Sequence, residues 1–128
     1  MESGRYTVEI EPEVRRWLEN IPAHRYVTVE QKVDRLAVHA TTLGEPYSRH
    51  LGGGLRELRF DLDGSALRVT YWIAPGRRVV LLTVFRKTRM RETAEAERAR
   101  SAQAVCEAGH EPAAEHAVYS RDIKEEPR

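Results

Sequence analysis

Apolar residues in the first part of the chain follow the periods of one strand and two helices. Apolar and polar residues alternate over 5–10, which predicts a strand with one buried face. From Pro12, a residue favoured in the first turn of a helix, apolar positions recur at helical spacing until Pro22. A longer helical stripe follows over 24–43 and ends before Gly44. We therefore expect a strand followed by two antiparallel helices.

The second part of the chain predicts three strands and a final helix. Strand patterns occupy about 55–62, 66–74 and 79–86, and strong helix formers fill 92–107. Three glycines at 52–54 precede the first of these strands. They lack the further spaced glycines, or the Gly-Lys-Ser/Thr ending, that nucleotide-binding loops need. We therefore expect a plain loop there.

The dipeptide Asp63-Gly64 predicts a two-residue hairpin, because a type I′ turn needs positive φ at both positions. In this register Arg59 lies opposite Arg68. Such a pair is destabilised by a few tenths to ~1 kcal/mol, and an arginine cannot lose its proton to escape the repulsion. Two interpretations stay open. Either Glu57 and Asp61 neutralise the arginines in a surface ion-pair lattice, or a bound phosphate completes the group and is held by the guanidinium forks.

A second turn centred on Pro75-Gly76 would place Thr83 beside Arg68 and Phe85 beside Ala66. Side chains alternate faces along a strand, so the sheet then divides into two faces. One is apolar, includes Val80, Leu82 and Val84, and needs the helices as its cover. The other face is cationic and aromatic, and is expected to hold Glu57, Arg59, Asp61, Arg68, Thr70, Trp72, Thr83 and Phe85, with Lys87 just past the strand end.

Charge is unevenly distributed along the 128 residues, whose formal net charge is +1. The segment from Arg49 to Arg91 contains ten basic and three acidic side chains, a net charge of +7. Clustered cations repel one another until a ligand neutralises them, so this segment predicts a polyanionic ligand. We expect one domain over 1–108 and an acidic, mobile tail over 109–128, which could fold back over the basic face as a mimic of RNA.

Several classes of protein are excluded by composition. A single cysteine, Cys106, cannot form an intramolecular disulfide or a cysteine-based zinc site. The five histidines are scattered, and no His-Glu-x-x-His spacing occurs, so no metal is expected. No stretch approaches the ~18 apolar residues that span a membrane. We expect a cytoplasmic protein without a cofactor or a membrane partner.

The order of these motifs resembles the RelE/ParE toxin superfamily, and most nearly the HigB toxins described as phage-derived Gp49-like. The resemblance covers about 1–105 and is carried, from Leu51 to Ala99, by L-G-G-G-L-R-E-L-R-F, L-R-V-T-Y-W, V-V-L-L-T-V-F-R-K-T and E-A-E-R-A. It implies an α+β fold like that of small microbial ribonucleases. The elements would follow the order β-α-α-β-β-β-α, with an antiparallel sheet packed on a helical hairpin.

The resemblance also implies a toxin of a type II toxin–antitoxin system, paired with a helix-turn-helix antitoxin. RelE-like toxins are endoribonucleases that cleave mRNA on the ribosome and so inhibit translation. Carried over by position, the catalytic residues would be Arg59, Arg68 and Lys87, with Glu57 as a candidate orienter or base. The expected RNA-binding residues are Arg49, His50, Phe85 and Arg86.

Cleavage of RNA without a metal needs a base for the 2′-hydroxyl, stabilisation of the phosphorane, and an acid for the leaving 5′-oxygen. The two arginines suit the second role, and His50 has an ordinary pKa near neutrality. Two other functions stay open on the same scaffold. One is a ParE-like inhibitor of gyrase, and the other is a non-catalytic module that binds an antitoxin and regulates its operon.

Overall fold

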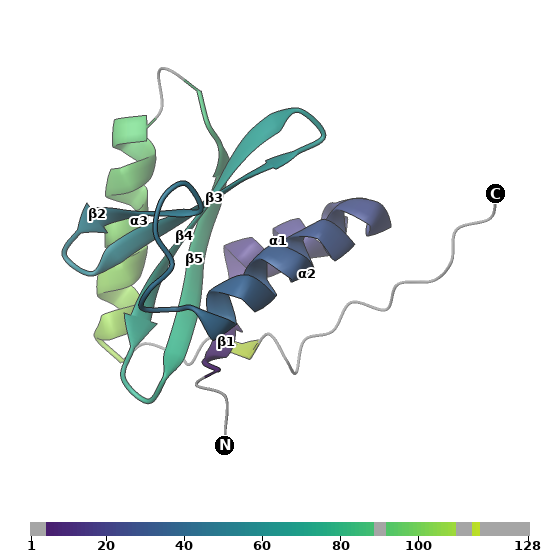
Figure 1. Cartoon of the computed structure of the whole chain (residues 1–128). Helices are drawn as coiled ribbons and strands as arrows, with labels where there is room; N and C mark the ends of the chain where they lie inside the picture. The colour runs from purple at the N-terminus through teal and green to yellow at the C-terminus, as the bar shows by residue number, and fades with distance from the viewer. Residues whose placement is uncertain (1–4, 89–91, 110–113, 116–128) are drawn as a thin grey trace.

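The computed structural model describes residues 5–88, 92–109 and 114–115. A single twisted sheet separates two helical layers (Figure 1). The helices α1 (Pro12–Asn20) and α2 (Ala23–Val38) pack on one face, and α3 (Glu92–Glu107) packs on the other. Each layer covers its own apolar cluster, so α3 packs on the face that the sequence predicts to be cationic and aromatic.

The sheet contains six strands in the order β2-β3-β4-β5-β1-β6. In chain order these are β1 (Thr7–Ile10), β2 (Ser48–Gly52), β3 (Leu55–Leu62), β4 (Ser65–Ala74), β5 (Arg78–Arg86) and β6 (Ala114–Glu115). The strand β1 runs parallel to β5, and all other neighbours are antiparallel. The predicted α+β fold and the antiparallel meander β3-β4-β5 are confirmed, but the prediction of an antiparallel sheet is wrong for β1, because alternation shows that a strand is half-buried but not which neighbour it pairs with.

Two short strands lie where the sequence predicts none. The strand β2 occupies the segment before the glycines and pairs with β3, with an irregularity between His50 and Gly52. The strand β6 falls in the predicted tail and pairs with β1, on the side of the sheet away from β2. Apart from β6 and Gly109, the residues of 109–128 lie outside the described part of the chain.

The predicted first and last helices are confirmed, but α2 ends five residues before the predicted Leu43. The carbonyl of His39 accepts the backbone N–H groups of Thr42 (2.9 Å) and Leu43 (2.7 Å), which closes a turn instead of a further helical turn. Ala40 and Leu43 remain buried in the core. The apolar stripe therefore identified the buried residues correctly and the end of the helix incorrectly.

The first hairpin has the predicted register, with Arg59 directly opposite Arg68. Its loop residues Asp63 and Gly64 have φ values of 49° and 85°, as a type I′ turn requires. The Asp63 carboxylate accepts a hydrogen bond from Arg25 Nε (2.7 Å) and lies 3.0 Å from a ring nitrogen of His24. These contacts hold the pKa of Asp63 below its ordinary value and attach the turn to the first residues of α2.

The second hairpin differs from the prediction. Its loop has three residues, 75–77, because Ala74 pairs with Arg78. A further shift between Thr70 and Tyr71 marks a bulge in the ladder. As a result Arg68 lies opposite Phe85, not opposite Thr83.

The three-residue loop shifts the ladder by one residue and so exchanges the faces of the β5 residues between the turn and the bulge, and the bulge restores the predicted faces beyond it. Val80 and Leu82, predicted to lie under the helical hairpin, instead form a cluster with Ala99 of α3. Val79 and Leu81 take their places in the core under α1 and α2. The apolar contribution of β5 is thus divided between both helical layers.

The glycine loop serves as the anchor of α3. The guanidinium group of Arg100 donates hydrogen bonds to the carbonyls of Leu51 (2.5 Å) and Gly52 (3.2 Å). The side-chain amide of Gln103 donates to the carbonyl of Gly53 (2.9 Å). These contacts fix α3 against the loop and bring its N-terminal turn over the sheet.

Replacing Gln103 with alanine is expected to lower the free energy of unfolding by about 1–3 kcal/mol, because the Gly53 carbonyl loses its donor in a partly buried site. Urea denaturation measures this change. Gln31→Ala, on the exposed face of α2, is the matched control and should leave the midpoint unchanged. An equal effect of the two substitutions would show that the anchor contributes nothing.

Candidate functional site

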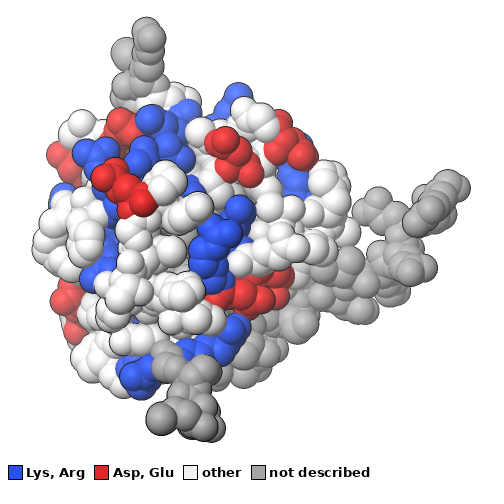
Figure 2. Space-filling model, viewed as in Figure 1, with Lys and Arg blue, Asp and Glu red and all other residues white. Residues whose placement is uncertain are grey.

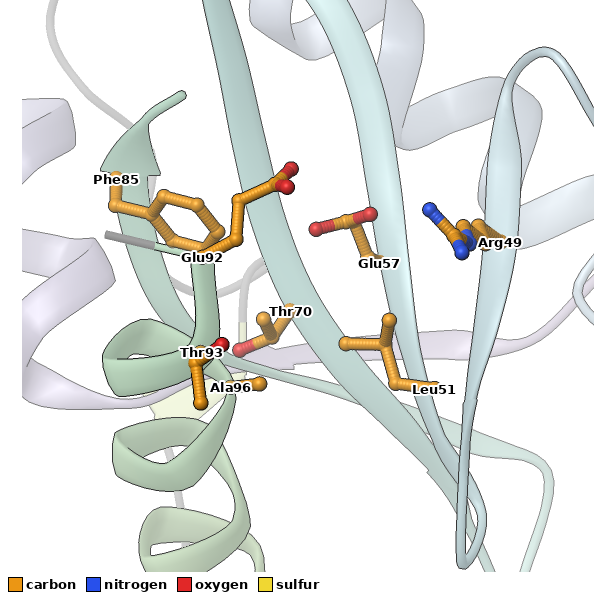
Figure 3. Close-up of a pocket in the computed structure, with 8 residues that line it drawn as sticks. All are labelled: Arg49, Leu51, Glu57, Thr70, Phe85, Glu92, Thr93 and Ala96. Atoms are coloured by element: carbon orange, nitrogen blue, oxygen red, sulfur yellow. The ribbon is translucent and has the colours of Figure 1, made fainter. Parts of the chain in front are cut away.

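A pocket of about 270 Å³ lies between the sheet and the N-terminal turn of α3. Four strands and the helix supply its walls, so it forms only after β2, β3, β4, β5 and α3 have come together. Figure 3 shows the residues that line it, which are Arg49, Leu51, Glu57, Thr70, Phe85, Glu92, Thr93 and Ala96. Below its floor Thr70 and Thr83 share a hydrogen bond between their hydroxyl oxygens (2.5 Å), which joins β4 to β5.

The two paired arginines beside this pocket are incompletely neutralised. Arg68 is only 7% exposed, and one of its terminal nitrogens donates to the carbonyl of Leu67 (2.9 Å). Arg59 lies 3.5 Å from a carboxylate oxygen of Glu45 and 3.8 Å from one of Glu57. Among the described residues, the Nε atoms of both arginines are buried and have no hydrogen-bond partner. A buried donor without a partner costs ~1–3 kcal/mol, so an anion here would satisfy groups that the fold leaves open.

The electrostatic environment of Arg68 is correspondingly unfavourable. Burial lowers the pKa of its guanidinium group, and the charge of Arg59 adds to this effect. The carboxylates of Glu57 and Glu92 act in the opposite direction. An anion bound by both arginines would relieve their repulsion and supply the acceptors that Nε lacks.

Glu57 occupies the centre of the pocket wall and is 5% exposed. It pairs with Arg49 across the β2–β3 ladder, on the same face. Burial raises the pKa of its carboxyl group, the charges of Arg68 and Arg59 oppose the rise, and the nearby Glu92 adds to it. Figure 3 shows the Glu57 carboxylate between Arg49 and Glu92.

Glu92 is the one ionisable residue of the pocket lining that the sequence did not predict. It begins α3, and its carboxylate lies 3.9 Å from the ammonium nitrogen of Lys87. In Figure 3 it points into the pocket toward Glu57. In the sequence, Glu92 is marked only by its position as the first acidic residue of the helix that follows Lys87. An acidic residue at this position usually indicates no more than the solvent-exposed N-terminus of a helix.

Phe85 separates the pocket from a more open groove of about 550 Å³. Arg86, Lys87 and Glu95 line this groove together with Phe85, which is 9% exposed. The structure thus places Arg86 and Lys87 next to the pocket. Trp72 has a different role, because its indole N–H donates to the sulfur of Cys106 (3.4 Å) in α3.

His50 is the predicted site residue that the structure does not bring to the pocket. Its neighbours Arg49 and Leu51 both line the pocket, so His50 points to the other face of β2, where it pairs with Arg56. In the described part of the chain no histidine lines the pocket. The remaining predicted residues Arg49, Glu57, Arg59, Arg68, Phe85, Arg86 and Lys87 gather in or beside the pocket.

The predicted cationic face has more acidic side chains near it than the charge of the segment from Arg49 to Arg91 suggests. Figure 2 shows acidic and basic patches that alternate over one face of the molecule. At the site, Glu45 and Glu92 approach Arg59 and Lys87, and both carboxylates come from outside the window from Arg49 to Arg91. Part of the predicted ion-pair lattice therefore exists, although among the described residues it leaves the arginine Nε atoms without hydrogen bonds.

Sulfate is expected to raise the Tm of the wild-type chain more than that of Arg68→Met at matched ionic strength. Sulfate stabilises folded proteins in general, so the difference between the two chains reports occupation of the site. An anion at a hundred times its Kd stabilises by about 2.7 kcal/mol. Thermal denaturation in sodium sulfate and sodium chloride measures the effect, with the exposed Arg16→Met as control. Equal increments in all three chains would contradict an anion site.

Within 5–88, 92–109 and 114–115, no group of three or more histidine, cysteine, aspartate or glutamate side chains is arranged to hold a metal ion. No helix in these ranges is long and apolar enough to cross a membrane.

Comparison with solved structures relates this fold to bacterial toxins. The free state of a mutant of the Escherichia coli toxin RelE matches with a TM-score of 0.51 and 12% identity, covering 73% of this chain and 90% of that chain. The Mycobacterium tuberculosis toxin–antitoxin complex RelBE2 matches with a TM-score of 0.49 and 25% identity, covering 65% of this chain and 99% of that chain. The chain therefore shares the RelE fold.

Comparison of sequences gives the family. A search of curated proteins found no match. The model of the family described as "Phage derived protein Gp49-like (DUF891)" matches residues 16–105, which include the second half of α1, all of α2, strands β2 to β5 and most of α3. The match spans more than two thirds of the 128 residues. The chain belongs to the phage-derived Gp49-like family.

Proposed function

We propose that this chain is the toxin of a toxin–antitoxin pair and that it cleaves mRNA on the ribosome, in the cytoplasm. The observation that carries the proposal is the facing pair of arginines, Arg59 and Arg68, whose buried Nε atoms have no hydrogen-bond partner among the described residues. They lie beside a pocket that also contains carboxylates. A site with permanent positive charge and acid–base groups suits attack on a phosphodiester.

The arginines would bind the scissile phosphate. As the 2′-hydroxyl attacks, negative charge grows on the phosphorane oxygens, and fixed guanidinium groups in a buried site stabilise that charge more than they stabilise the ground state. Lys87, held next to the pocket by its position after β5, adds a further cation. Dependence on the 2′-hydroxyl makes RNA, and not DNA, the expected substrate.

Phe85 would divide the nucleotides on the two sides of the cleaved bond. It borders both the pocket and the open groove, so one nucleotide fits on each side of it. Arg86 and Lys87 line the groove and can meet the backbone phosphates there. A helix-turn-helix antitoxin would neutralise the toxin by keeping mRNA from this surface.

Expression of Lys87→Ala is expected to relieve the growth arrest that the wild-type chain causes, whereas Arg16→Ala, on the exposed face of α1, should arrest growth as wild type does. Brief induction followed by measurement of mRNA and chromosomal DNA tests the proposal. Loss of full-length mRNA with intact DNA supports it. DNA breaks with intact mRNA would indicate a block of gyrase, and binding of an antitoxin without any growth effect would indicate a non-catalytic module.

A further inference from the structure

Two carboxylates enter the same pocket from different elements. Glu57 projects from the middle of β3, and Glu92 projects from the first turn of α3, 35 positions later in the chain. Figure 3 shows them pointing toward each other across the space that Phe85 and Thr70 border. Paired carboxylates repel when both are ionised, so an arrangement that holds them together needs a compensating function or a shared proton.

Four basic side chains lie near this pair. Arg49 of β2, Arg59 of β3 and Arg68 of β4 all act on the charge of Glu57. Glu92 lies 3.9 Å from Lys87, which follows β5, and acts on Arg68. Arg68 itself is more than nine-tenths buried and keeps an Nε donor without a described partner. The carboxylates thus border a position that already has unsatisfied donors for an anion.

We propose that Glu92 is a catalytic residue, acting as the general base on the 2′-hydroxyl of RNA while Glu57 acts as the general acid on the leaving 5′-oxygen. This inference rests on the proposed function, because it assigns the two proton transfers that the arginines cannot perform. Glu92 belongs neither to the predicted site nor to the arginine pair.

The different surroundings of the two carboxyl groups decide which one is the acid. Glu57 is 5% exposed, and burial raises its pKa, so it retains a proton to higher pH than an ordinary glutamate. The side chain of Glu92 is 49% exposed and its carboxylate lies 3.9 Å from the ammonium nitrogen of Lys87, so Glu92 is open to solvent and to a substrate. Two titratable groups whose environments differ in this way take the roles of acid and base.

The step balances without a co-reactant. The ionised Glu92 removes the proton from the 2′-hydroxyl, and the 2′-oxygen forms a bond to phosphorus. Arg59 and Arg68 hold the phosphorane oxygens. The bond from phosphorus to the 5′-oxygen then breaks, and Glu57 donates its proton to that oxygen. The products are a 2′,3′-cyclic phosphate and a 5′-hydroxyl, and proton exchange with water restores the original state of both carboxyl groups.

Two synthetic mRNAs presented on programmed ribosomes test this assignment. One carries the ordinary 5′-oxygen at the cleavage position, and the other carries sulfur there, which leaves without being protonated. With the oxygen substrate, Glu92→Gln and Glu57→Gln are each expected to cleave about 100-fold or more slowly than wild type. Sulfur should restore Glu57→Gln to within about tenfold of wild type and should not restore Glu92→Gln.

Glu97→Gln is the matched control, because it removes the same charge from an exposed position of α3. Glu97→Gln should cleave at the wild-type rate. Its cleavage rate should also increase with pH over the acidic part of the pH profile, as the rate of the wild type does. Glu92→Gln should lose that rise, which a merely structural role would not change. Circular dichroism spectra of all variants are needed to check that they are folded.

The possible failures are distinct. If wild type cleaves, Arg68→Ala does not, and Glu92→Gln cleaves at the wild-type rate or faster, the role of Glu92 is refuted and the proposed function stands. Rescue of Glu92→Gln by sulfur would refute its role as the base. If wild type cleaves neither mRNA, the proposed function fails and this assignment fails with it.

Discussion

Replacing Arg68 with alanine is expected to slow mRNA cleavage by about 10²–10³-fold and to abolish growth arrest. The guanidinium group of Arg68 is held in place by the carbonyl of Leu67 and lies opposite Arg59, so its charge is fixed before the substrate arrives. Burial removes most of the water that would screen this charge. Its loss should therefore affect the transition state, where charge on the phosphate is greatest.

Two companion variants separate charge from geometry. Arg68→Lys keeps the positive charge but loses the planar fork, and should recover only part of the rate. Arg16→Ala removes an exposed arginine from α1 and should have no effect. Single-turnover cleavage on programmed ribosomes measures all three. Wild-type rates in Arg68→Ala, with the protein folded, would show that the arginine pair has no part in the reaction.

Glu57→Gln is expected to raise the Tm at neutral pH while it slows cleavage about 100-fold. Burial raises the pKa of this carboxyl group above its ordinary value of 4.5. The folded chain then binds more protons than the unfolded chain, so the free energy of unfolding falls as pH increases from about 4.5 through the folded pKa. A glutamine at this position does not ionise, so the free energy of unfolding of the variant does not fall with pH in this way.

The stabilisation should therefore depend on pH. The Tm of Glu57→Gln should exceed that of wild type at pH 8 by more than at pH 4, where the wild-type carboxyl group is protonated in both states. Thermal denaturation over this range measures it. A lower Tm than wild type at pH 8 would mean that the ion pairs of Glu57 with the arginines outweigh the cost of its burial, which contradicts the raised pKa.

Local signals in the sequence were sufficient for the helices and for the first hairpin. The turn Asp63-Gly64 has one strongly favoured geometry, and this fixes the register that places Arg59 opposite Arg68. Helix formers and helix-ending residues are equally local, which explains why α1 and α3 were predicted well. The anion-binding half of the site follows from these local rules.

The second hairpin shows where local rules fail. A three-residue loop in place of a two-residue turn, and a bulge at Thr70, cannot be read from alternation, because apolar residues fill both faces of β5. Val79, Val80, Leu81 and Leu82 are all buried, some under the helical hairpin and some under α3. A continuous apolar run gives no period from which the register could be derived.

The acid–base half of the site depends on tertiary structure alone. Glu92 reaches the pocket because Arg100 and Gln103 attach α3 to the carbonyls of the glycine loop. The sequence predicts only a plain loop there, because the fingerprint of a nucleotide-binding loop is missing, and nothing in it signals that the loop anchors α3. Likewise, Glu45 approaches Arg59 only through the path of the chain between α2 and β2.

The chemistry of the RNA ends tests the central claim most directly. Purified wild-type protein and Arg68→Ala are each incubated with programmed ribosomes, and the new ends of the mRNA are mapped and identified. Attack by the 2′-hydroxyl at the arginine pair predicts fragments with a 2′,3′-cyclic phosphate and a 5′-hydroxyl in the wild-type reaction only. Intact mRNA with wild type, or the same fragments in equal yield with Arg68→Ala, would contradict the account.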